Sequence, residues 1–223
     1  MKIGAITIGQ SPRNDIVCEV LPLLSEGTEL IQRGALDDLS LEEILALAPV
    51  EGDSVLITRL LDGTNVSLAE KYIVSGLQRA IDYLEAEGVK FIVFFCTGNF
   101  TDLTSKNVPL IFPCDLMHSV VPLLSKTSEM VAVSPSPLQK EEMTEIWGKY
   151  MKKCHAISAS PYESWDLLVE AAREARDLPG DILVMDCIGY TQEMKEMFAK
   201  ESGKTIILPR TFLARIISEL TDI

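Results

Sequence analysis

Cys96 and Cys187 are the residues of this sequence whose type and setting best suit chemistry. Each follows a short apolar run, 91–95 or 182–185, and each is followed two residues later by a glycine. We expect a helix to begin just after each cysteine, where free backbone N–H groups favour the thiolate form. One thiolate can remove a proton from carbon while the other thiol returns one. The pair therefore predicts acid–base chemistry that requires no metal or organic cofactor.

The other three cysteines are expected to be structural residues. Cys18, Cys114 and Cys154 lack the glycine two residues on, and no C-x-x-C pair indicates zinc or a disulfide framework. A cysteine that closes a buried strand can also be a small apolar core residue. That alternative is open for Cys96 and Cys187, but their matched settings favour function.

The matched settings extend into an internal repeat. After each Cys-x-Gly comes a second apolar run that ends at Pro113 or Pro209, followed by a helical pattern. The first strand of each half also leads to a Ser-Pro pair, at Ser11 and Ser134. This predicts two similarly folded lobes related by an approximate twofold. If the lobes face each other, the two thiols converge on one cleft.

The elements that must position these thiols alternate between strands and helices along the chain, which predicts an α/β fold with mainly parallel sheets. Capping boxes at Ser40, Ser67 and Ser160 predict helix starts. The expected strands are Lys2–Ile8, Glu29–Gln32, Ser54–Thr58, Phe91–Phe95, Pro109–Phe112, Met130–Ser134, Cys154–Ser158, Ile182–Met185 and Thr205–Leu208.

The amino-acid composition limits the classes of partner that this protein is expected to bind. The 223 residues are 47% hydrophobic and 24% charged, with a net charge of −13. Such an acidic protein is a poor ligand for nucleic acids and for anionic membrane surfaces. The N-terminus lacks a signal-peptide pattern, and no apolar run reaches the ~18 residues of a membrane span. We expect a cytoplasmic protein with reduced thiols.

A small carboxylate remains a plausible ligand despite that charge, because a few cations can hold it locally. Arg13 and Arg59 follow expected strands and are the best candidates, and Arg210 is a third. Each can equally be a surface arginine. Neither His118 nor His155 has the spacing of a metal site, so we expect both to be structural and no metal to be bound.

The motifs together carry a family resemblance over nearly the full length. Segments 7–15, 60–63 and 185–189 are similar to the AroM branch of the Asp/Glu/hydantoin racemase superfamily. The Cys96 and Cys187 motifs resemble those of the superfamily itself. The resemblance implies two Rossmann-like lobes, 1–113 with 211–223 and 114–210, with the active site between them. It also implies that helix 211–221 crosses back onto the first lobe.

The resemblance further implies roles for individual residues. Cys96 and Cys187 match the acid/base cysteines of the racemases. The residues implied to hold a substrate carboxylate are Ser11, Arg13, Thr97, Gly98, Asn99, Ile188, Gly189, Tyr190 and Thr191. Arg59 joins this set from its position after an expected strand.

Two functions are therefore expected. The first is a cofactor-independent racemase, epimerase or related isomerase acting on the α-carbon of a small carboxylate or amino acid. The alternative is a non-catalytic carboxylate-binding or regulatory protein on the same fold. A homodimer is compatible with either.

Overall fold

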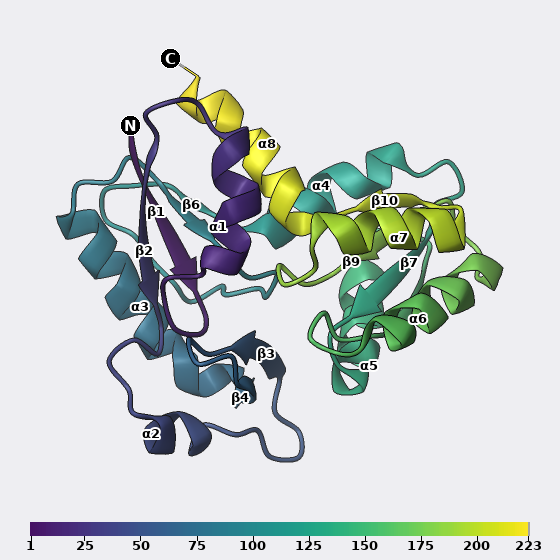
Figure 1. The fold of residues 1–223 in the computed structure, drawn as a ribbon, viewed down its shortest axis with the longest axis horizontal. Coiled ribbons are helices and arrows are strands. Elements are labelled where there is room, and N and C mark those ends of the chain that lie inside the picture. The colour runs from purple at the N-terminus through teal and green to yellow at the C-terminus, as the bar shows by residue number, and fades with distance from the viewer. Residues whose placement is uncertain (223) are drawn as a thin grey trace. The chain divides into compact units, whose positions relative to one another are not determined.

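A computed structural model describes residues 1–222. The chain forms two compact units, one of Met1–Pro113 with the residues from Ala214 on, and one of Cys114–Leu213. Both units are built from parallel β-sheets and helices, which confirms the predicted α/β class (Figure 1). No described helix is long and apolar enough to cross a membrane.

The first unit contains a four-stranded parallel sheet in the order β2-β1-β5-β6 and a separate antiparallel hairpin, β3-β4. Its elements are β1 (Lys2–Thr7), α1 (Asn14–Val20), the 3₁₀ helix η1 (Leu21–Leu23), β2 (Glu29–Gly34), α2 (Leu41–Leu45), β3 (Val55–Arg59), β4 (Asn65–Ala69), α3 (Glu70–Ala86), β5 (Ile92–Phe94) and β6 (Leu110–Ile111).

The second unit contains another four-stranded parallel sheet, in the order β10-β9-β7-β8. Its elements, with the helix that enters it and the helix that leaves it, are α4 (Pro113–Leu124), β7 (Glu129–Ser134), η2 (Pro137–Gln139), α5 (Lys140–Trp147), β8 (Lys153–Ser158), α6 (Trp165–Asp177), β9 (Ile182–Met185), α7 (Gln192–Ser202), β10 (Thr205–Ile207) and α8 (Pro209–Thr221).

The two sheets have the same topology, which confirms the repeat seen in the sequence. The first sheet has the strand order β2-β1-β5-β6. The second sheet, read in the opposite direction from the order given above, is β8-β7-β9-β10, so the strands correspond one to one. The central pairs match in detail, because Ile6 on β1 pairs with Phe94 on β5 and Val133 on β7 pairs with Met185 on β9. Helices α4 and α8 then follow the last strand of each sheet.

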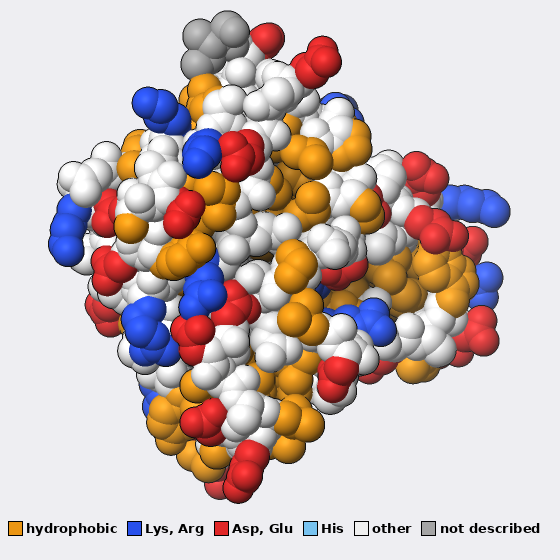
Figure 2. All heavy atoms as spheres, turned by 60° about the vertical axis from the view of Figure 1, so that its left-hand side comes forward, with side chains coloured by type: hydrophobic (Ala, Val, Ile, Leu, Met, Phe, Trp, Pro, Cys, Tyr) orange, Lys and Arg blue, Asp and Glu red, His pale blue; other side chains and the backbone are white. Residues whose placement is uncertain are grey.

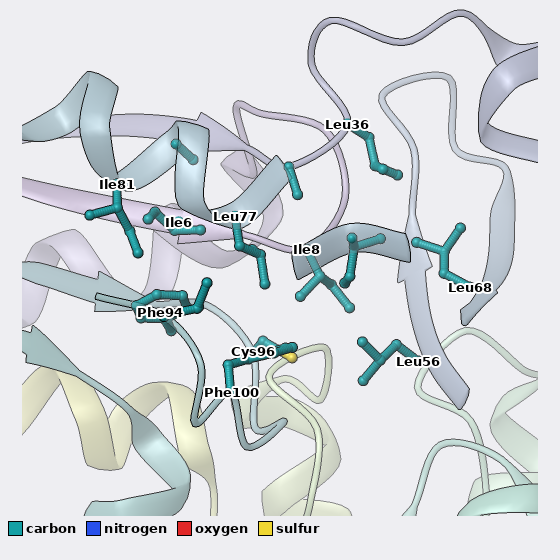
Figure 3. Packing of buried hydrophobic residues seen from close by; sticks show 14 of the residues in the cluster. Ile6, Ile8, Leu36, Leu56, Leu68, Leu77, Ile81, Phe94, Cys96 and Phe100 are labelled. Carbon is teal, nitrogen blue, oxygen red and sulfur yellow. The ribbon is translucent and has the colours of Figure 1, made fainter. Parts of the chain in front are cut away.

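Apolar residues from the first sheet and α3 form the core of the first unit (Figure 3). Leu77 and Ile81 on α3 are fully buried with Ile6 and Phe94 on the strands. Their spacing of four residues places them on one face of the helix, which is why α3 covers the sheet. Phe94 also stacks on Phe112, with the ring centroids 4.3 Å apart.

In the second unit the sheet is buried on both faces, as its near-continuous apolar strands predict. One cluster joins the strands to α6 and α7 through residues such as Leu168 and Phe198. The other joins them to α4 and α5 through Met117 and Trp147. The central strands β7 and β9 are therefore buried on both faces between these two clusters.

Two kinds of local prediction were wrong, the first at two of the three capping boxes. The box at Ser67 does not cap a helix, because Ser67 pairs with Ile57 in the β3-β4 hairpin and α3 begins at Glu70. Backbone pairing with a strand ten residues earlier outweighs the local capping preference. The box at Ser160 does not begin a helix either, because residues 161–163 form a turn and α6 begins at Trp165 with Ser164 as its N-cap. By contrast, the box at Ser40 caps α2 with both of its reciprocal hydrogen bonds.

The second correction concerns the segment after Cys96. No helix connects β5 and β6 in the described chain, and residues 97–109 form an irregular loop. Phe100 and Leu103 anchor this loop in the core, while Glu85 on α3 accepts three hydrogen bonds from it. Anchoring by side chains thus replaces the expected helix.

The acidic side chains are dispersed over the visible face rather than gathered in one patch (Figure 2). Lysine and arginine side chains lie among them, and apolar groups appear in small areas. On this face, the acidic residues that contribute to the net charge of −13 therefore do not form a single acidic patch.

Candidate functional site

Cys96 lies at the carboxyl end of the first sheet, two residues beyond the end of β5. The backbone N–H of Phe95 still donates to Ile6 of β1 at 2.7 Å, and the chain then leaves the sheet. Cys96 is 7% exposed and packs beside Phe100 (Figure 3). Its sulfur accepts a hydrogen bond from the N–H of Gly98 at 3.3 Å. This N–H favours negative charge on sulfur where the expected helix is absent.

Cys187 lies at the matching place of the second sheet. The backbone N–H of Asp186 donates to Val133 of β7 at 2.9 Å, as Phe95 does to Ile6 in the first unit. Cys187 is 8% exposed, and its sulfur accepts a hydrogen bond from the N–H of Gly189 at 3.4 Å. The structure thus places the two cysteines in equivalent positions, each with the same N–H to sulfur contact within a Cys-x-Gly turn.

Glycine fits both turns because neighbouring side chains fill the space where a Cβ would lie. A Cβ on Gly98 would lie 3.0 Å from the ring of Phe100. A Cβ on Gly189 would lie 2.7 Å from the hydroxyl of Tyr162 and 2.9 Å from Pro161. A larger residue would therefore require these neighbouring side chains to shift, which disfavours any residue but glycine in both turns.

The loop after β1 lies at the same edge of the first sheet as Cys96, since β1 and β5 are parallel neighbours. Asp37 holds this loop. Its carboxylate accepts hydrogen bonds from the N–H and the hydroxyl of Ser11, both at 2.6 Å, and from the N–H of Gly34 at 2.8 Å. Asp37 therefore fixes both the backbone N–H and the hydroxyl group of Ser11.

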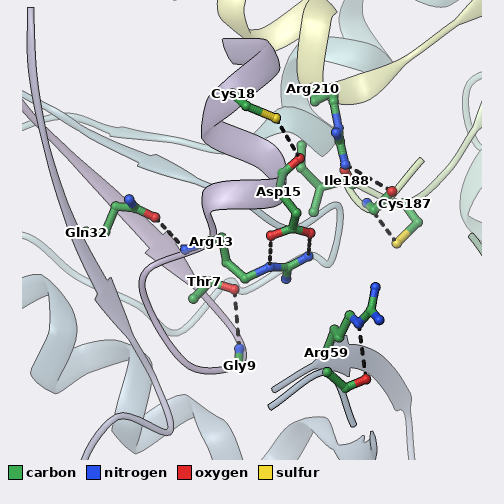
Figure 4. A network of polar contacts seen from close by, with 12 residues as sticks. Thr7, Gly9, Arg13, Asp15, Cys18, Gln32, Arg59, Cys187, Ile188 and Arg210 are labelled. Carbon is green, nitrogen blue, oxygen red and sulfur yellow. Dashed lines mark hydrogen bonds and ion pairs between the residues drawn. The ribbon is translucent and has the colours of Figure 1, made fainter. Parts of the chain in front are cut away.

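Arg13 ends the same loop and is 5% exposed. Its guanidinium donates to both carboxylate oxygens of Asp15, from Nε at 2.8 Å and from Nη2 at 2.7 Å (Figure 4). Its backbone N–H donates to Gln32 at 2.8 Å. Two parallel N–H···O bonds are the usual geometry with which an arginine binds a carboxylate. In this structure the carboxylate is that of Asp15.

Arg59 lies at the end of β3, in the hairpin rather than in the parallel sheet. It is exposed, and its Nε donates to the carbonyl of Gly63 across the hairpin turn at 3.1 Å. The hairpin is tied to the loop after β1, because Leu61 donates its N–H to the side chain of Gln10 at 3.2 Å. Thr97 is half-buried, and Asn99 is exposed in the loop after Cys96.

The residues after Cys187 are engaged in holding their own loop. Tyr190 is fully buried and donates its hydroxyl to the carbonyl of Ala159, and burial raises its pKa well above the usual range. Thr191 is the N-cap of α7, accepting the N–H of Met194 at 3.2 Å. Ile188 is buried as well. These residues shape the turn beside the sulfur.

The other three cysteines differ from Cys96 and Cys187 in their surroundings. Burial raises the pKa of Cys114 and of Cys154 to about 12, and the negative charges of Asp115 and Asp186 add to the effect. Both are neutral apolar core groups at physiological pH. Cys18 is exposed on α1, where its thiol contacts the carbonyl of Asp15 at 3.5 Å.

Both histidines have structural surroundings. His118 stacks on Tyr150 with ring centroids 4.4 Å apart, and burial lowers its pKa. His155 contacts Glu129 at 3.2 Å. Among residues 1–222, no three His, Cys, Asp or Glu side chains gather in a way that could hold a metal ion.

Three supporting residues could not be identified from the sequence pattern. Asp37 comes from the loop after β2, Tyr162 from the loop after β8, and Asp186 accepts the indole N–H of Trp147 at 2.8 Å. An acidic residue just beyond a strand end is the one sequence signal that Asp37 and Asp186 share. Such a signal does not reveal the partner, which comes from a distant segment.

Known structures share this fold over almost the whole chain. Allantoin racemase from Klebsiella pneumoniae is 15% identical with a TM-score of 0.65, covering 99% of this chain and 87% of that one. The aspartate racemase of Picrophilus torridus is 14% identical with a TM-score of 0.64, covering 99% and 94%. The maleate isomerase Iso of Pseudomonas putida S16 is 11% identical with a TM-score of 0.64, covering 100% and 93%.

At these identities the likeness establishes the fold, which is that of racemases and isomerases. No curated protein matches the sequence. A family model described as AroM protein matches residues 3–221, nearly the entire chain. The chain with this duplicated sheet and its two Cys-x-Gly turns therefore belongs to the AroM family.

Proposed function

We propose that this protein is a cofactor-independent racemase, epimerase or related isomerase that acts on the α-carbon of a small carboxylate or amino acid. One observation carries the proposal. Two thiols occupy equivalent positions at the carboxyl ends of two equivalent sheets, and each accepts an N–H from its own Cys-x-Gly turn. Loops at this edge are where α/β sheets bind ligands.

The proposed reaction uses Cys96 and Cys187 as acid and base on one substrate carbon. The thiolate of one cysteine takes the α-proton, so the C–H bond breaks, an S–H bond forms and the electron pair delocalises into the carboxyl group. The thiol of the other cysteine then donates its proton to the opposite face of that carbon and becomes a thiolate. The protonation states of the two sulfurs are exchanged after each inversion, and reaction in the opposite direction restores them.

The substrate carboxylate is proposed to be held by donors at the same strand ends. Backbone N–H groups of the two Cys-x-Gly turns, with Thr97, Asn99 and the loop containing Ser11, supply hydrogen bonds. Arg13 and Arg59 supply positive charge. The fork of Arg13 binds Asp15 in this structure, so a substrate carboxylate has to displace Asp15 from it. Small carboxylates and amino acids are the class that such donors recognise.

Solvent exchange tests the proposal directly. The wild-type protein in D₂O is incubated with a panel of small carboxylates and amino acids, and mass spectrometry follows deuterium at the α-carbon while polarimetry follows inversion. We expect both in wild type for at least one compound. Cys96→Ser and Cys187→Ser should each abolish inversion of that compound, because serine is a far weaker acid and base at this position. Cys154→Ser is the matched control and should retain activity.

The requirement that both sulfurs reach one carbon has its own test. Dibromobimane joins two thiols that lie within its short span, and peptide mapping identifies the pair. We expect Cys96 crosslinked to Cys187. Inversion that survives in both serine variants contradicts the two-cysteine mechanism.

A non-catalytic binding protein on the same fold is the second candidate, favoured by the burial of Cys96 and Cys187, which are 7% and 8% exposed. Thiols this buried can serve as small apolar packing groups beneath loops that hold a ligand. Calorimetric binding of a carboxylate that shows no deuterium exchange would support this candidate against the isomerase.

A further inference from the structure

Arg210 is a buried cation beside the loop that carries Cys187. It is the second residue of α8 and is 1% exposed. Its Nε donates to the carbonyl oxygen of Ile188 at 3.0 Å, and its Nη2 donates to that of Gly189 at 2.9 Å (Figure 4). The planar guanidinium binds the two successive carbonyls through two of its nitrogens, in the fixed fork geometry of an arginine. Arg210 thus clamps the two residues that follow Cys187.

The clamp and the sulfur share one peptide unit. The carbonyl of Ile188 and the N–H of Gly189 belong to the same amide, which accepts from Arg210 at its oxygen. At its nitrogen this amide donates to the sulfur of Cys187 at 3.4 Å. Because hydrogen bonds in a chain polarise one another, an amide whose oxygen binds a cation is a stronger donor. A donor of this kind stabilises a thiolate more than a thiol.

The loop that carries Cys187 lies near acidic residues, which destabilise a thiolate, so a nearby cation would offset their effect. Asp186 and Glu163 are acidic, and both act electrostatically on the buried Tyr190 beside Cys187. Tyr162 and Tyr190 are phenols, and burial keeps Tyr190 neutral. The two carboxylates oppose a negative sulfur, and Arg210 supplies the opposite charge.

The first half of the repeat offers an internal comparison. Pro113 and Pro209 begin α4 and α8 at equivalent points of the repeat, and the next residues are Cys114 and Arg210. The pKa of Cys114 is about 12, so this residue is neutral at physiological pH. The cation at this position therefore belongs to the second half of the repeat alone.

We propose that Arg210 is a positioning residue that holds the Ile188–Gly189 peptide so that its N–H stabilises the thiolate of Cys187. The assignment of Cys187 as the reacting group rests on the proposed function. The effect of Arg210 on that thiol is a property of the second unit that can be measured without any substrate.

The first experiment measures the rate of iodoacetamide labelling of each cysteine against pH, using peptide mass spectrometry. Arg210→Met removes the charge and the fork at similar volume, and Arg210→Lys keeps the charge. For Arg210→Met we expect the midpoint of the Cys187 profile to rise by about half a pH unit, which is about a threefold smaller thiolate fraction near neutral pH. Arg210→Lys should recover part of that shift.

Two controls distinguish a specific shift of the Cys187 profile from a general destabilisation of the protein. The Cys96 profile, measured in the same samples, should stay where it is in wild type. Arg173→Met removes an exposed arginine of α6 from the same unit and should leave the Cys187 profile unchanged. An unshifted Cys187 profile in Arg210→Met overturns the proposal, and so does an equal shift of Cys96.

A second measurement needs no substitution of Arg210, in case its loss prevents folding. In wild-type protein, the NMR resonance of the Arg210 Nε–H should titrate with the same midpoint as Cys187 labelling, and in Cys187→Ser that titration should vanish. A resonance that does not titrate, or one that titrates equally in Cys187→Ser, overturns the proposal.

The outcomes for Arg210 and for the isomerase activity can be told apart. A shifted labelling profile without deuterium exchange on any compound supports the role of Arg210 and counts against the isomerase. Exchange and inversion in wild type with an unshifted profile in Arg210→Met support the isomerase and refute this role of Arg210.

Discussion

Asp37 is expected to be the main support of the loop after β1, and its removal offers a quantitative test. Its side chain is 11% exposed and accepts three hydrogen bonds, two from Ser11 and one from Gly34. The neighbouring Asp38 is 64% exposed and pairs only with Arg33 among the contacts the structure gives it. The two adjacent aspartates therefore form a matched pair that differs in burial and in bonding.

The expected loss follows from those three bonds. Hydrogen bonds to a charged group contribute about 1.5–3 kcal/mol each. Ser11 is half-buried, so water can replace part of what Asp37→Ala removes, whereas the N–H of Gly34 is buried. We expect Asp37→Ala to lower the free energy of unfolding by about 2–4 kcal/mol. For a chain of this length each kcal/mol lowers Tm by roughly 2–4 °C.

Urea unfolding followed by circular dichroism measures the change, with Asp38→Ala as control. An exposed ion pair contributes at most about 1 kcal/mol, so Asp38→Ala should stay close to wild type. Asp37→Asn should retain most of the defect, because its amide must turn a donor toward the N–H of Ser11 or of Gly34. Hydrogen exchange should accelerate at both amides. Equal stability of Asp37→Ala and Asp38→Ala would refute this account of the loop.

Two further predictions concern pH and packing. The N–H of Lys126 and the hydroxyl of Ser125 lower the pKa of Asp181 from 3.8 to about 2. The resulting stability is therefore present above the ordinary value and lost as pH falls toward 2. Urea unfolding at a series of pH values should show Asp181→Asn less stable than wild type at pH 7, with the difference shrinking between pH 4 and pH 2; a constant difference contradicts this. Gly76→Ala in α3 would stabilise an isolated helix by about 1 kcal/mol. Here its Cβ would lie 2.4 Å from the carbonyl of Ala35, so we expect destabilisation by about 1–3 kcal/mol in thermal unfolding, and a gain would contradict the packing.

Periodic patterns predicted most of the fold. The nine expected strands all form, with ends that differ by at most two residues from the observed bounds. Short apolar runs predict such strands because a strand in the middle of a covered sheet buries both of its faces. The strand Asn65–Ala69 was missed. Its local pattern favours a helix cap, and only its pairing with Val55–Arg59 decides otherwise.

The candidate site was predicted less completely than the fold. The equivalence of Cys96 and Cys187 could be read from the repeat, and the matching N–H contacts agree with it. The helix expected after Cys96 is absent, since Glu85 and the buried Phe100 hold an irregular loop there. Whether these cysteines react stays a prediction.

The sequence alone determined what depends on short-range order. Alternating apolar runs specified an α/β chain, and the recurrence of strand, Cys-x-Gly and proline specified that the fold is built twice. Tertiary structure alone decided the polar contacts that surround the thiols. Asp37 reaches Ser11, and Arg210 reaches Ile188, across more than twenty residues of chain in each case. Hydrogen bonds depend on distances of a few tenths of an ångström between such distant segments, and no local pattern records them.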